Sequence, residues 1–561
     1  MNVLTNLENG KGLQKMKERI FLGIDVGTGS VRVGAFNREG RLRGKAEYPV
    51  KVWRPKHEFV EQSSEDIWKA TCEAMNLCLR TGRINPKSIG GLSFDATCSL
   101  VALGESFRPI TVSPSKKENQ NIIVWMDHRA VEQAERINQT GHEVLQYVGG
   151  RISPEMESPK LLWIKENLKE TWKRTLKFMD LADYMVYRAS GNDMRSLCTA
   201  VCKWTYLGHE GGSGTYRADF FEAVGIQDLF DKGRVPFTAY PMGSLAGGLT
   251  RKAAKDLGLI QGTPVGVGII DAHAGGIGSL GPVLQDATVE EDPFRKSIAL
   301  IAGTSSCHMG VSPTPRFIQG IWGPYYGAMI PGMWLNEGGQ SATGSLIDLV
   351  IRNNSSYPDI AKTARTKRSD IFTILNRMIE AMKKKDGWMI GRNLHVLPYH
   401  HGNRSPRADP YAKGMVSGLT LNETPEDVAL LYYATMQAIA YGTRHIIEAM
   451  NEKGYDIQNI HVTGGHLKNS LFIRENADVT GCKIILPKEP EAVLLGSAIV
   501  AAVAGGEFPN ILQGMKSMSH AARVIEPNPS TARFHDAKYE IFKEMYDFQK
   551  KTHSKMEQTI R

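Results

Sequence analysis

The chain of 561 residues has little that would place it in a membrane or outside the cell. Its longest apolar stretch, residues 492–506, is rich in Ala and Gly and shorter than the ~20 residues that span a bilayer, so we expect a buried helix. Residues 1–18 are polar and lack the apolar core of a secretory leader. Seven scattered cysteines are typical of free thiols in a reducing compartment. We therefore expect a cytoplasmic protein without a membrane partner.

Several binding signatures are also missing. The Gly-rich turn at 27–30 lacks the Gly-Lys-Ser/Thr of a P-loop, and Arg32 stands where a dinucleotide fingerprint has its third Gly. Cys198 and Cys202 are four residues apart, but no second Cys/His pair stands at zinc spacing, so no zinc site is predicted. The net charge of +9 suits anionic ligands. The basic residues are scattered, however, and indicate no nucleic-acid partner.

What the chain does contain is the same kind of turn twice. Residues 20–34 and residues 298–309 each show an apolar strand, then Gly-Thr with small hydroxyl residues, then a second strand. Either turn alone is compatible with a plain hairpin. Two such hairpins facing each other across a cleft would offer N–H groups and hydroxyls to a chain of phosphates. A chain of this length is too long for a single hydrophobic core, so we expect two domains. Because each would begin with the same kind of hairpin, the sequence predicts two related halves.

Strand-like and helix-like segments alternate along the chain, which favours an α/β architecture. We expect strands at 89–94, 121–125, 265–270, 460–463 and 484–486, and helices at 63–80, 427–451, 469–481, 492–504 and near 542–550. The acidic stretch 284–296 is the expected domain junction. The predicted organisation is an extension over residues 1–18, a first domain over 19–285 and a second over 296–561.

Carboxylates stand next to glycine-rich backbone at two expected strand ends. Asp271 follows an apolar Gly-rich strand, where it can act as a general base or cap the next helix. His273 beside it is expected to be structural. Asp25 precedes the first turn and can hold Mg²⁺ through water. The Gly464-Gly465 pair allows a flat ring or ribose to approach the backbone, or simply makes a tight turn.

Taken together and in order, these motifs resemble the FGGY family of carbohydrate kinases over residues 20–506. The matching segments are the first hairpin, Asp-Ala-Thr at 95–97, Trp-Met-Asp-His-Arg at 125–129, Ser-Pro-Lys-Leu-Leu-Trp at 158–163, Asp271 in its Gly-rich strand, Gly-Thr-Ser at 303–305, Asn-Arg-Ser-Pro at 403–406 and Gly-Gly at 464–465. The resemblance implies the two-domain fold shared by actin, heat-shock chaperone ATPases and hexokinase (ribonuclease H-like), with ATP and sugar in the interdomain cleft.

Within the family, the segments at 94–97, 303–308 and 402–406 resemble the ribulokinase branch, above all its eukaryotic-type D-ribulokinases. The resemblance implies ATP- and Mg²⁺-dependent phosphorylation of D-ribulose, with Asp271 as general base. It implies a sugar site of Ala96, Lys203, Asp271 and Glu337, and an ATP site of Gly27, Thr28, Gly29, Ser30, Thr304, Ser305, Gly464, Gly465 and Asn469.

Two alternatives of function and the oligomeric state stay open at this stage. The substrate can be L-ribulose, D-xylulose or another ketose or polyol, because the sequence does not determine the stereochemistry of one hydroxyl. A non-catalytic ATP-binding regulatory protein on the same fold is a second alternative, although a pure binder needs no base in its cleft. The oligomeric state is open and allows a homodimer.

Overall fold

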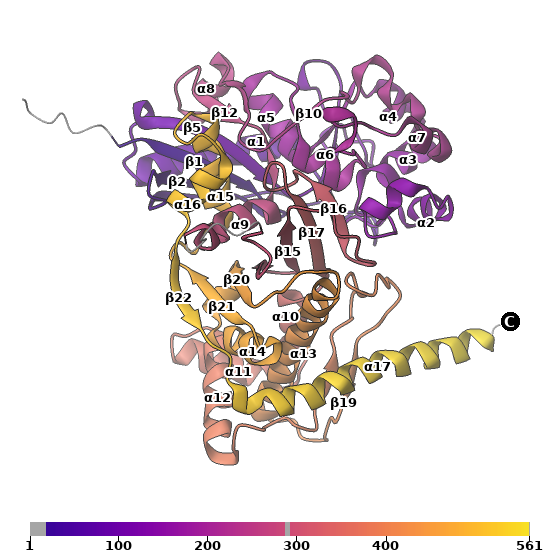
Figure 1. The fold of residues 1–561 in the computed structure, drawn as a ribbon, viewed down its shortest axis with the longest axis vertical. Coiled ribbons are helices and arrows are strands. Elements are labelled where there is room, and N and C mark those ends of the chain that lie inside the picture. Colours follow the sequence, from indigo (N-terminus) through magenta and orange to yellow (C-terminus); the bar gives the residue numbers. More distant parts are fainter. Residues whose placement is uncertain (1–17, 286–291, 560–561) are drawn as a thin grey trace, which may run out of the picture.

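The computed structural model describes residues 18–285 and 292–559, which fold around two large mixed sheets (Figure 1). The strands of the first sheet are β1 Ile20–Val26, β2 Ser30–Asn37, β3 Leu42–Pro49, β5 Ile89–Ala96, β11 Leu245–Gly248, β12 Pro264–Gly266 and β13 Ile269–Ile270. Those of the second sheet are β14 Ser297–Ala302, β15 Ser306–Ser312, β16 Trp322–Tyr326, β17 Trp334–Gln340, β20 Asn459–Thr463, β21 Lys483–Pro487 and β22 Ala521–Ile525.

The two sheets repeat one topology. In order, β3-β2-β1-β5-β12-β11 of the first sheet corresponds to β17-β15-β14-β20-β21-β22 of the second. Each has an antiparallel hairpin, β1–β2 or β14–β15, whose first strand runs parallel to β5 or β20. The remaining neighbours also pair in the same sense in both sheets. The two predicted hairpins therefore start two halves of the same design.

Smaller sheets and helices surround this frame. The short strands are β4 Glu61–Gln62, β6 Leu100–Leu103, β7 Ile122–Ile123, β8 Lys177–Asp180, β9 Arg195–Ser196, β10 Ala239–Tyr240, β18 His395–Leu397 and β19 Met415–Ser417. The α-helices are α1 Ser64–Thr81, α2 Val131–Gln139, α3 Glu157–Asn167, α4 Lys169–Arg174, α5 Leu181–Ser190, α6 Leu197–Lys203, α7 Ala218–Val224, α8 Arg251–Leu257, α9 Asp271–Ser279, α10 Gly344–Arg352, α11 Tyr357–Thr366, α12 Ile371–Asp386, α13 Pro425–Asn451, α14 Ser470–Thr480, α15 Ala492–Ala504, α16 Ile511–Met518 and α17 Ala532–Gln558.

Local chemistry explains where the main helices begin. The Ser63 side chain accepts a hydrogen bond from the Asp66 amide at 3.3 Å and starts α1 one residue after the predicted position. Thr424 and Asp427 form a reciprocal capping box at the start of α13. The predicted strand at 265–270 is two strands, β12 and β13, both beside β5.

Helix α15 joins the two halves. It follows the second sheet in sequence, yet it packs against β1, β5 and α9 of the first half (Figure 1). Its residues Leu494 and Leu495 belong to the same buried apolar cluster as Phe21 and Leu92. A Cβ on Gly496 would lie 1.8 Å from the carbonyl oxygen of Ala274, so glycine permits the close approach of α15 to α9. This helix lies where sequence predicts it, over residues 492–504.

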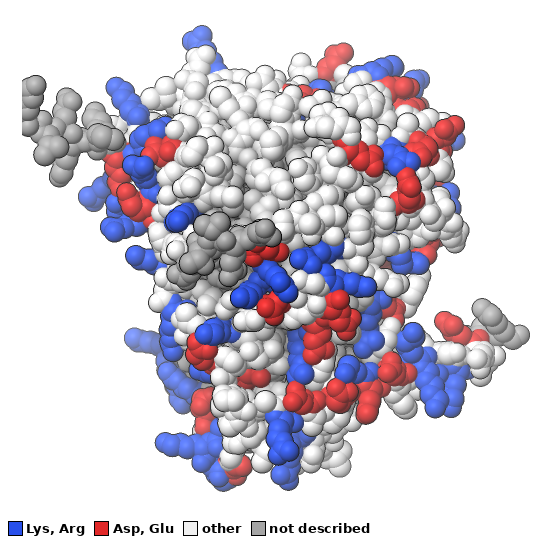
Figure 2. Space-filling view, in the orientation of Figure 1, with Lys and Arg blue, Asp and Glu red and all other residues white. Residues whose placement is uncertain are grey.

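The predicted domain limits stay a prediction. Residues 1–17 of the predicted extension, and residues 286–291 within the predicted junction, lie outside the described residues. No helix in 18–285 or 292–559 has the length and apolarity that a bilayer crossing requires. On the face drawn in Figure 2, Lys and Arg are interspersed with Asp and Glu rather than gathered in one field. The net charge of +9 is therefore not concentrated there.

Candidate active site

One cleft of about 380 Å³ lies where the turns of the two hairpins approach each other. The first half contributes the β1–β2 turn, the end of β5 and the start of α9. The second half contributes the β14–β15 turn and the loop after β20. The predicted site residues that line it are Asp25, Gly27, Thr28, Lys203, Asp271, Thr304, Ser305, Glu337, Gly464 and Gly465. Residues from nearly the whole length of the chain thus meet in one cleft.

A cluster of carboxylates occupies the first-half side of the cleft. Asp25 on β1 pairs in register with Asp95 on β5, and it forms an ion pair with Arg32 on β2. Burial raises the pKa of Asp25, although Arg32 opposes the shift. Burial and the charge of Asp25 raise the pKa of Asp95 well above its usual range, and the Ser497 hydroxyl on α15 donates to it. This cluster therefore holds protons as well as negative charge.

Asp271 is the first residue of α9 and reaches the cleft. Its carboxylate accepts a hydrogen bond from the Ala272 amide at 2.7 Å, so the helix start orients the side chain. Burial first, and then the charge of Asp25, raise the pKa of Asp271 to about 7. The capping interpretation of Asp271 is wrong, because Ile270 is the N-cap of α9 and no side chain caps this helix. A carboxylate with this pKa can accept a proton near neutral pH.

A second group of charges also lines the cleft. Arg404 forms a buried ion pair with Glu337 on β17 and stacks on the Trp322 ring, with its Cζ 3.7 Å from the ring centroid. The ammonium of Lys203 lies 4.4 Å from the same centroid. Burial alone would raise the pKa of Glu337, but Arg404 and Lys203 outweigh it and lower that pKa. The site therefore holds a fixed anion between two cations.

Glu155 adds a further anion beside these cations. Burial opposes its ionisation, but the contact with His128 and the charges of Arg404 and Lys203 lower the pKa of Glu155 to about 2. The His128 ring and the Glu155 carboxylate are 3.8 Å apart, nitrogen to oxygen. Alternating charges with many directional donors and acceptors suit a small polyhydroxyl ligand.

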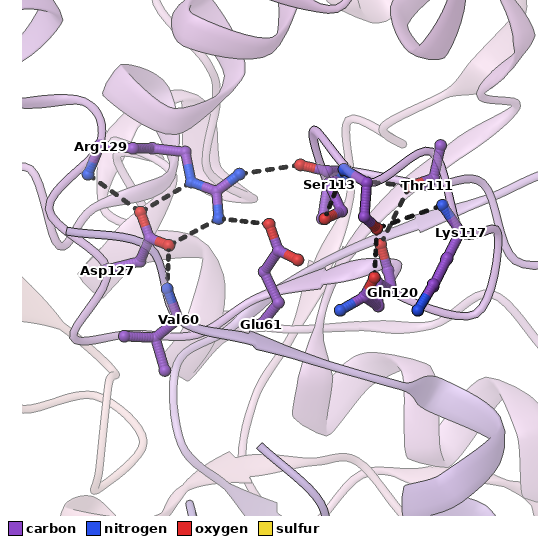
Figure 3. Close-up of polar contacts among 10 residues, drawn as sticks. Val60, Glu61, Thr111, Ser113, Lys117, Gln120, Asp127 and Arg129 are labelled. Atoms are coloured by element: carbon purple, nitrogen blue, oxygen red, sulfur yellow. Dashed lines mark hydrogen bonds and ion pairs between the residues drawn. The ribbon is translucent and has the colours of Figure 1, made fainter. Parts of the chain in front are cut away.

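A buried network holds the loop that carries His128 (Figure 3). Arg129 donates to both carboxylate oxygens of Asp127 and to Glu61 at 2.9 Å, and Asp127 also accepts from the Val60 amide at 2.6 Å. The Arg129 and Glu61 side chains have no exposed surface. The preceding Trp125 donates from its ring nitrogen to the Thr28 hydroxyl at 3.1 Å. The network thus ties this loop to the first hairpin turn.

The second-half side of the cleft is built mostly from backbone and small side chains. Gly464 has φ of +96°, and a Cβ there would lie 2.5 Å from the Ala302 carbonyl oxygen. The Gly464-Gly465 pair therefore makes a turn that a residue with a side chain would strain. At Gly465 a Cβ would meet nothing within 4 Å, so the cleft is open there. His466 bonds the Gly303 carbonyl at 2.9 Å and connects this turn to the second hairpin.

Four predicted binding residues do not line the cleft. Ala96 is fully buried at the end of β5. The Ser30 hydroxyl donates to Glu47 at 2.6 Å, and Gly29 lies exposed at the tip of the turn. Asn469 caps α14 by accepting from the Phe472 amide at 3.2 Å, and its amide group donates to Tyr432 at 2.7 Å. The Ser30 and Asn469 side chains thus have partners outside the cleft, whereas Ala96, which is expected to bind through its backbone, and Gly29 have only backbone polar groups.

Several residues that line the cleft were not predicted as site residues, notably Arg404, Glu155 and Cys307. Arg404 stands in the Asn-Arg-Ser-Pro segment recognised at 403–406. The motif therefore marked this segment but did not indicate what Arg404 does. Cys307 likewise stands in the recognised segment 303–308, whereas Glu155 stands in a segment without a chemical signature. The partner of Arg404, Glu337, is 67 positions away, which sequence spacing alone does not reveal.

Solved structures share this two-domain arrangement. A ligand-bound xylulose kinase from Lactobacillus acidophilus superposes with a TM-score of 0.75 at 19% identity, covering 96% of this chain and 100% of that one. A glycerol kinase from Plasmodium falciparum superposes with a TM-score of 0.73 at 15% identity, covering 94% and 98%. At these identities the likeness shows the fold alone. It confirms the predicted two-domain, actin-like α/β fold of the sugar kinases.

Family models then specify the class. Residues 20–278 match the N-terminal domain and residues 298–505 the C-terminal domain of the FGGY family of carbohydrate kinases. The chain belongs to this family, as predicted, and is a sugar kinase that uses ATP. An FGGY carbohydrate kinase domain-containing protein of Xenopus laevis is 46% identical over 544 residues, covering 96% of this chain and 98% of the relative. A D-ribulokinase of Saccharomyces cerevisiae is 36% identical over 536 residues, covering 90% and 75%.

Proposed function

We propose that this sugar kinase phosphorylates D-ribulose at its terminal hydroxyl to give D-ribulose 5-phosphate and ADP. The observation that carries the reaction type is Asp271, a carboxylate with a pKa of about 7 that lines the same cleft as the two hairpin turns, Lys203 and Glu337. The yeast relative named as a D-ribulokinase supports the choice of ketose. We favour a catalytic protein over the non-catalytic alternative, because its cleft contains both a candidate base, Asp271, and the polar group of Lys203 and Glu337.

In the proposed reaction, Asp271 accepts the proton of the terminal sugar hydroxyl as that oxygen attacks the γ-phosphorus of ATP. The bond between the γ-phosphorus and the β,γ-bridging oxygen breaks, and ADP leaves with that oxygen's electron pair. Glu337 and Lys203 hold the other sugar hydroxyls and the carbonyl oxygen, and Arg404 keeps Glu337 ionised. Positioning and electrostatic stabilisation carry most of the catalysis in phosphoryl transfer.

The phosphates would lie between the two hairpins. Gly27 and Thr28 face the γ-phosphate side, and Thr304 and Ser305 face the others. The Gly27 and Gly303 amides already bond within their own turns, at 3.0 and 2.9 Å, so they keep the turns rigid. Gly464 and Gly465 would leave room for the adenosine. Asn469 does not line the cleft, so any effect of it on ATP binding would come from its capping of α14.

The carboxylate cluster fits Mg²⁺. Asp25 and Asp271 both line the cleft, and the charge of Asp25 raises the pKa of Asp271 because Arg32 offsets only part of it. Oxygen ligands of this kind suit a hard divalent cation that keeps its waters. Asp25 would hold the ion through water, and Asp271 would stay available for the proton. When bound with ATP, the ion neutralises charge on the phosphate oxygens.

A coupled ADP-release assay tests this proposal. It runs with ATP and Mg²⁺ over D-ribulose, L-ribulose, D-xylulose, L-xylulose, ribitol, sedoheptulose and glycerol, with Asp271→Asn as the blank. A preference for D-ribulose that disappears in the variant is the expected result. Preference for another sugar would retain the kinase and replace the substrate. If no sugar releases ADP from protein that still binds ATP, the regulatory alternative replaces the proposal.

A further inference from the structure

A cluster of soft ligand atoms lies behind the cleft. Cys198 and Cys202 stand one turn apart on α6, and His273 stands on α9. The two sulfurs and one ring nitrogen lie within 4.8 Å of one another, and all three side chains are buried. Cys202 Sγ and His273 Nε2 are 3.4 Å apart. The sequence shows only the cysteine pair, because His273 is 71 positions from Cys202.

The cluster has the chemistry of a zinc-type site. Thiolate and imidazole bind Zn²⁺ at about 2.3 and 2.0 Å, so a sulfur and a nitrogen sharing one ion lie about 3.5 Å apart. The separation of Cys202 and His273 already matches this value. His273 Nδ1 is buried and has no hydrogen-bond partner among the described residues.

The number of donors indicates reversible binding. Structural zinc sites have four protein ligands, whereas this cluster supplies three among the described residues. The three side chains do not line the cleft, so an ion reaches them only when α6 and α9 separate locally. Two thiol protons must also leave for each ion bound. Slow and reversible occupancy follows from these features.

The position of the cluster connects it to the active site. Lys203 directly follows Cys202 at the end of α6, and Asp271 lies two residues before His273 at the start of α9. We propose that Cys198, Cys202 and His273 bind one Zn²⁺ per chain and that the bound ion slows phosphoryl transfer by drawing α6 and α9 together. The binding depends on the cluster alone. The inhibition also depends on the proposed roles of Lys203 and Asp271.

Binding is tested directly with Cd²⁺, whose thiolate charge-transfer absorption counts cysteine ligands, on chelator-treated full-length protein. The expected result is one ion per chain in wild type and at least ~10-fold weaker binding in Cys198→Ala. Cys482→Ala is the matched control, because Cys482 is also buried but belongs to no such cluster among the described residues. Equal binding in wild type and Cys198→Ala would overturn the site. If Cys198→Ala does not fold, zinc-edge X-ray absorption of wild type must show two sulfurs and one nitrogen, and any other set would overturn the site.

Inhibition is tested with Zn²⁺ in the ADP-release assay, using the sugar that the panel identifies. We expect slow-onset loss of turnover that excess sugar does not prevent, that chelator reverses, and that Cys198→Ala escapes. Cys98 and Cys307 line the cleft and are the competing thiols. Rapid inhibition that sugar prevents would assign the effect to them and overturn the inhibitory role. Confirmed Cd²⁺ binding without slow inhibition would retain the site and likewise overturn that role.

Discussion

In the first sheet, the residue two positions before the hairpin turn is Asp25, and its neighbours across the strands are Arg32 and Asp95. All three belong to strands that meet at the cleft. The charges interact strongly, because burial leaves little water to screen them. The central strands of the first half therefore place ionisable groups at the phosphate end.

In the second sheet, the equivalent residue is Ile301, and its neighbours are Cys307 and Thr463. The same topology thus carries an apolar residue, a thiol and a hydroxyl where the first half carries two carboxyl groups and a guanidinium. The comparison teaches that one duplicated frame can separate two tasks. The central strands of the first half bring charged side chains to the cleft, whereas the charges of the second half, Glu337 and Arg404, come from outside its central strands.

The sharpest test of this separation is Asp271→Asn. Turnover should fall by at least ~10²-fold, because the amide cannot accept the sugar proton, while ATP binding and folding change little. Initial rates and ATP titration measure both. Asp386→Asn, an exposed acid of the second half, is the control and should behave as wild type. Turnover near the wild-type value in Asp271→Asn would remove the proposed base.

Glu337→Gln tests the ionised carboxylate that β17 of the second sheet contributes to the proposed sugar site. We expect the KM for sugar to rise by at least ~10-fold with the KM for ATP unchanged, because hydrogen bonds to a charged acceptor are worth ~1.5–3 kcal/mol. The thermal midpoint should also fall, since Arg404 keeps its burial but loses its anion. Exposed Glu452→Gln is the control. An increase in the ATP KM alone would place Glu337 on the nucleotide side.

The pH profile tests the electrostatics of the first half. Asp271 must be unprotonated to accept a proton, so kcat/KM should be half-maximal at the pKa of about 7, become level only well above it, and fall as pH decreases below it. Below that pKa the slope should approach ~10-fold per pH unit. Arg32→Gln removes a cation whose charge directly lowers the pKa of Asp271, so the inflection should move upward. A rate that rises toward acid pH would contradict a carboxylate base.

The smallest expected effects belong to the two glycines after β20. Gly464→Ala should lower stability by ~1–2 kcal/mol, because φ is +96° and the Ala302 carbonyl blocks the Cβ. Gly465→Ala meets open space, so its thermal midpoint should stay unchanged while the KM for ATP rises a few-fold. Thermal unfolding and ATP kinetics separate the two. Unchanged ATP kinetics in Gly465→Ala would move the adenosine away from this turn.

Much of the frame was predictable because it is encoded locally. Both hairpins are recognisable in the sequence by apolar strands around Gly-Thr turns. An uninterrupted apolar segment predicts α15 over residues 492–504. The expected strand at 265–270 divides in two at 267–268, where a Cβ on Gly268 would lie 2.9 Å from the backbone of Ala182. That close approach depends on a distant helix, so its effect on the strand was not visible in sequence.

The site was predictable only where a single motif carries the chemistry. Asp271 and Gly464 follow recognisable strands, and both line the cleft. Asn469 at the nucleotide stays a prediction, and the structure adds that its side chain caps α14, which the sequence analysis did not foresee. Arg404 and Glu155 function through partners on other elements, and such pairings appear only once the chain is folded.

The placement of α15 has a consequence for how the protein is made. The sheet that begins at residue 20 is covered by a helix that begins at residue 492, so its apolar face stays open until most of the chain has left the ribosome. Synthesis proceeds at about 5–20 residues per second, so the exposed interval lasts roughly tens of seconds. During that time the nascent first half presents a surface that chaperones bind. The first half is therefore completed late in synthesis, although its strands are made first.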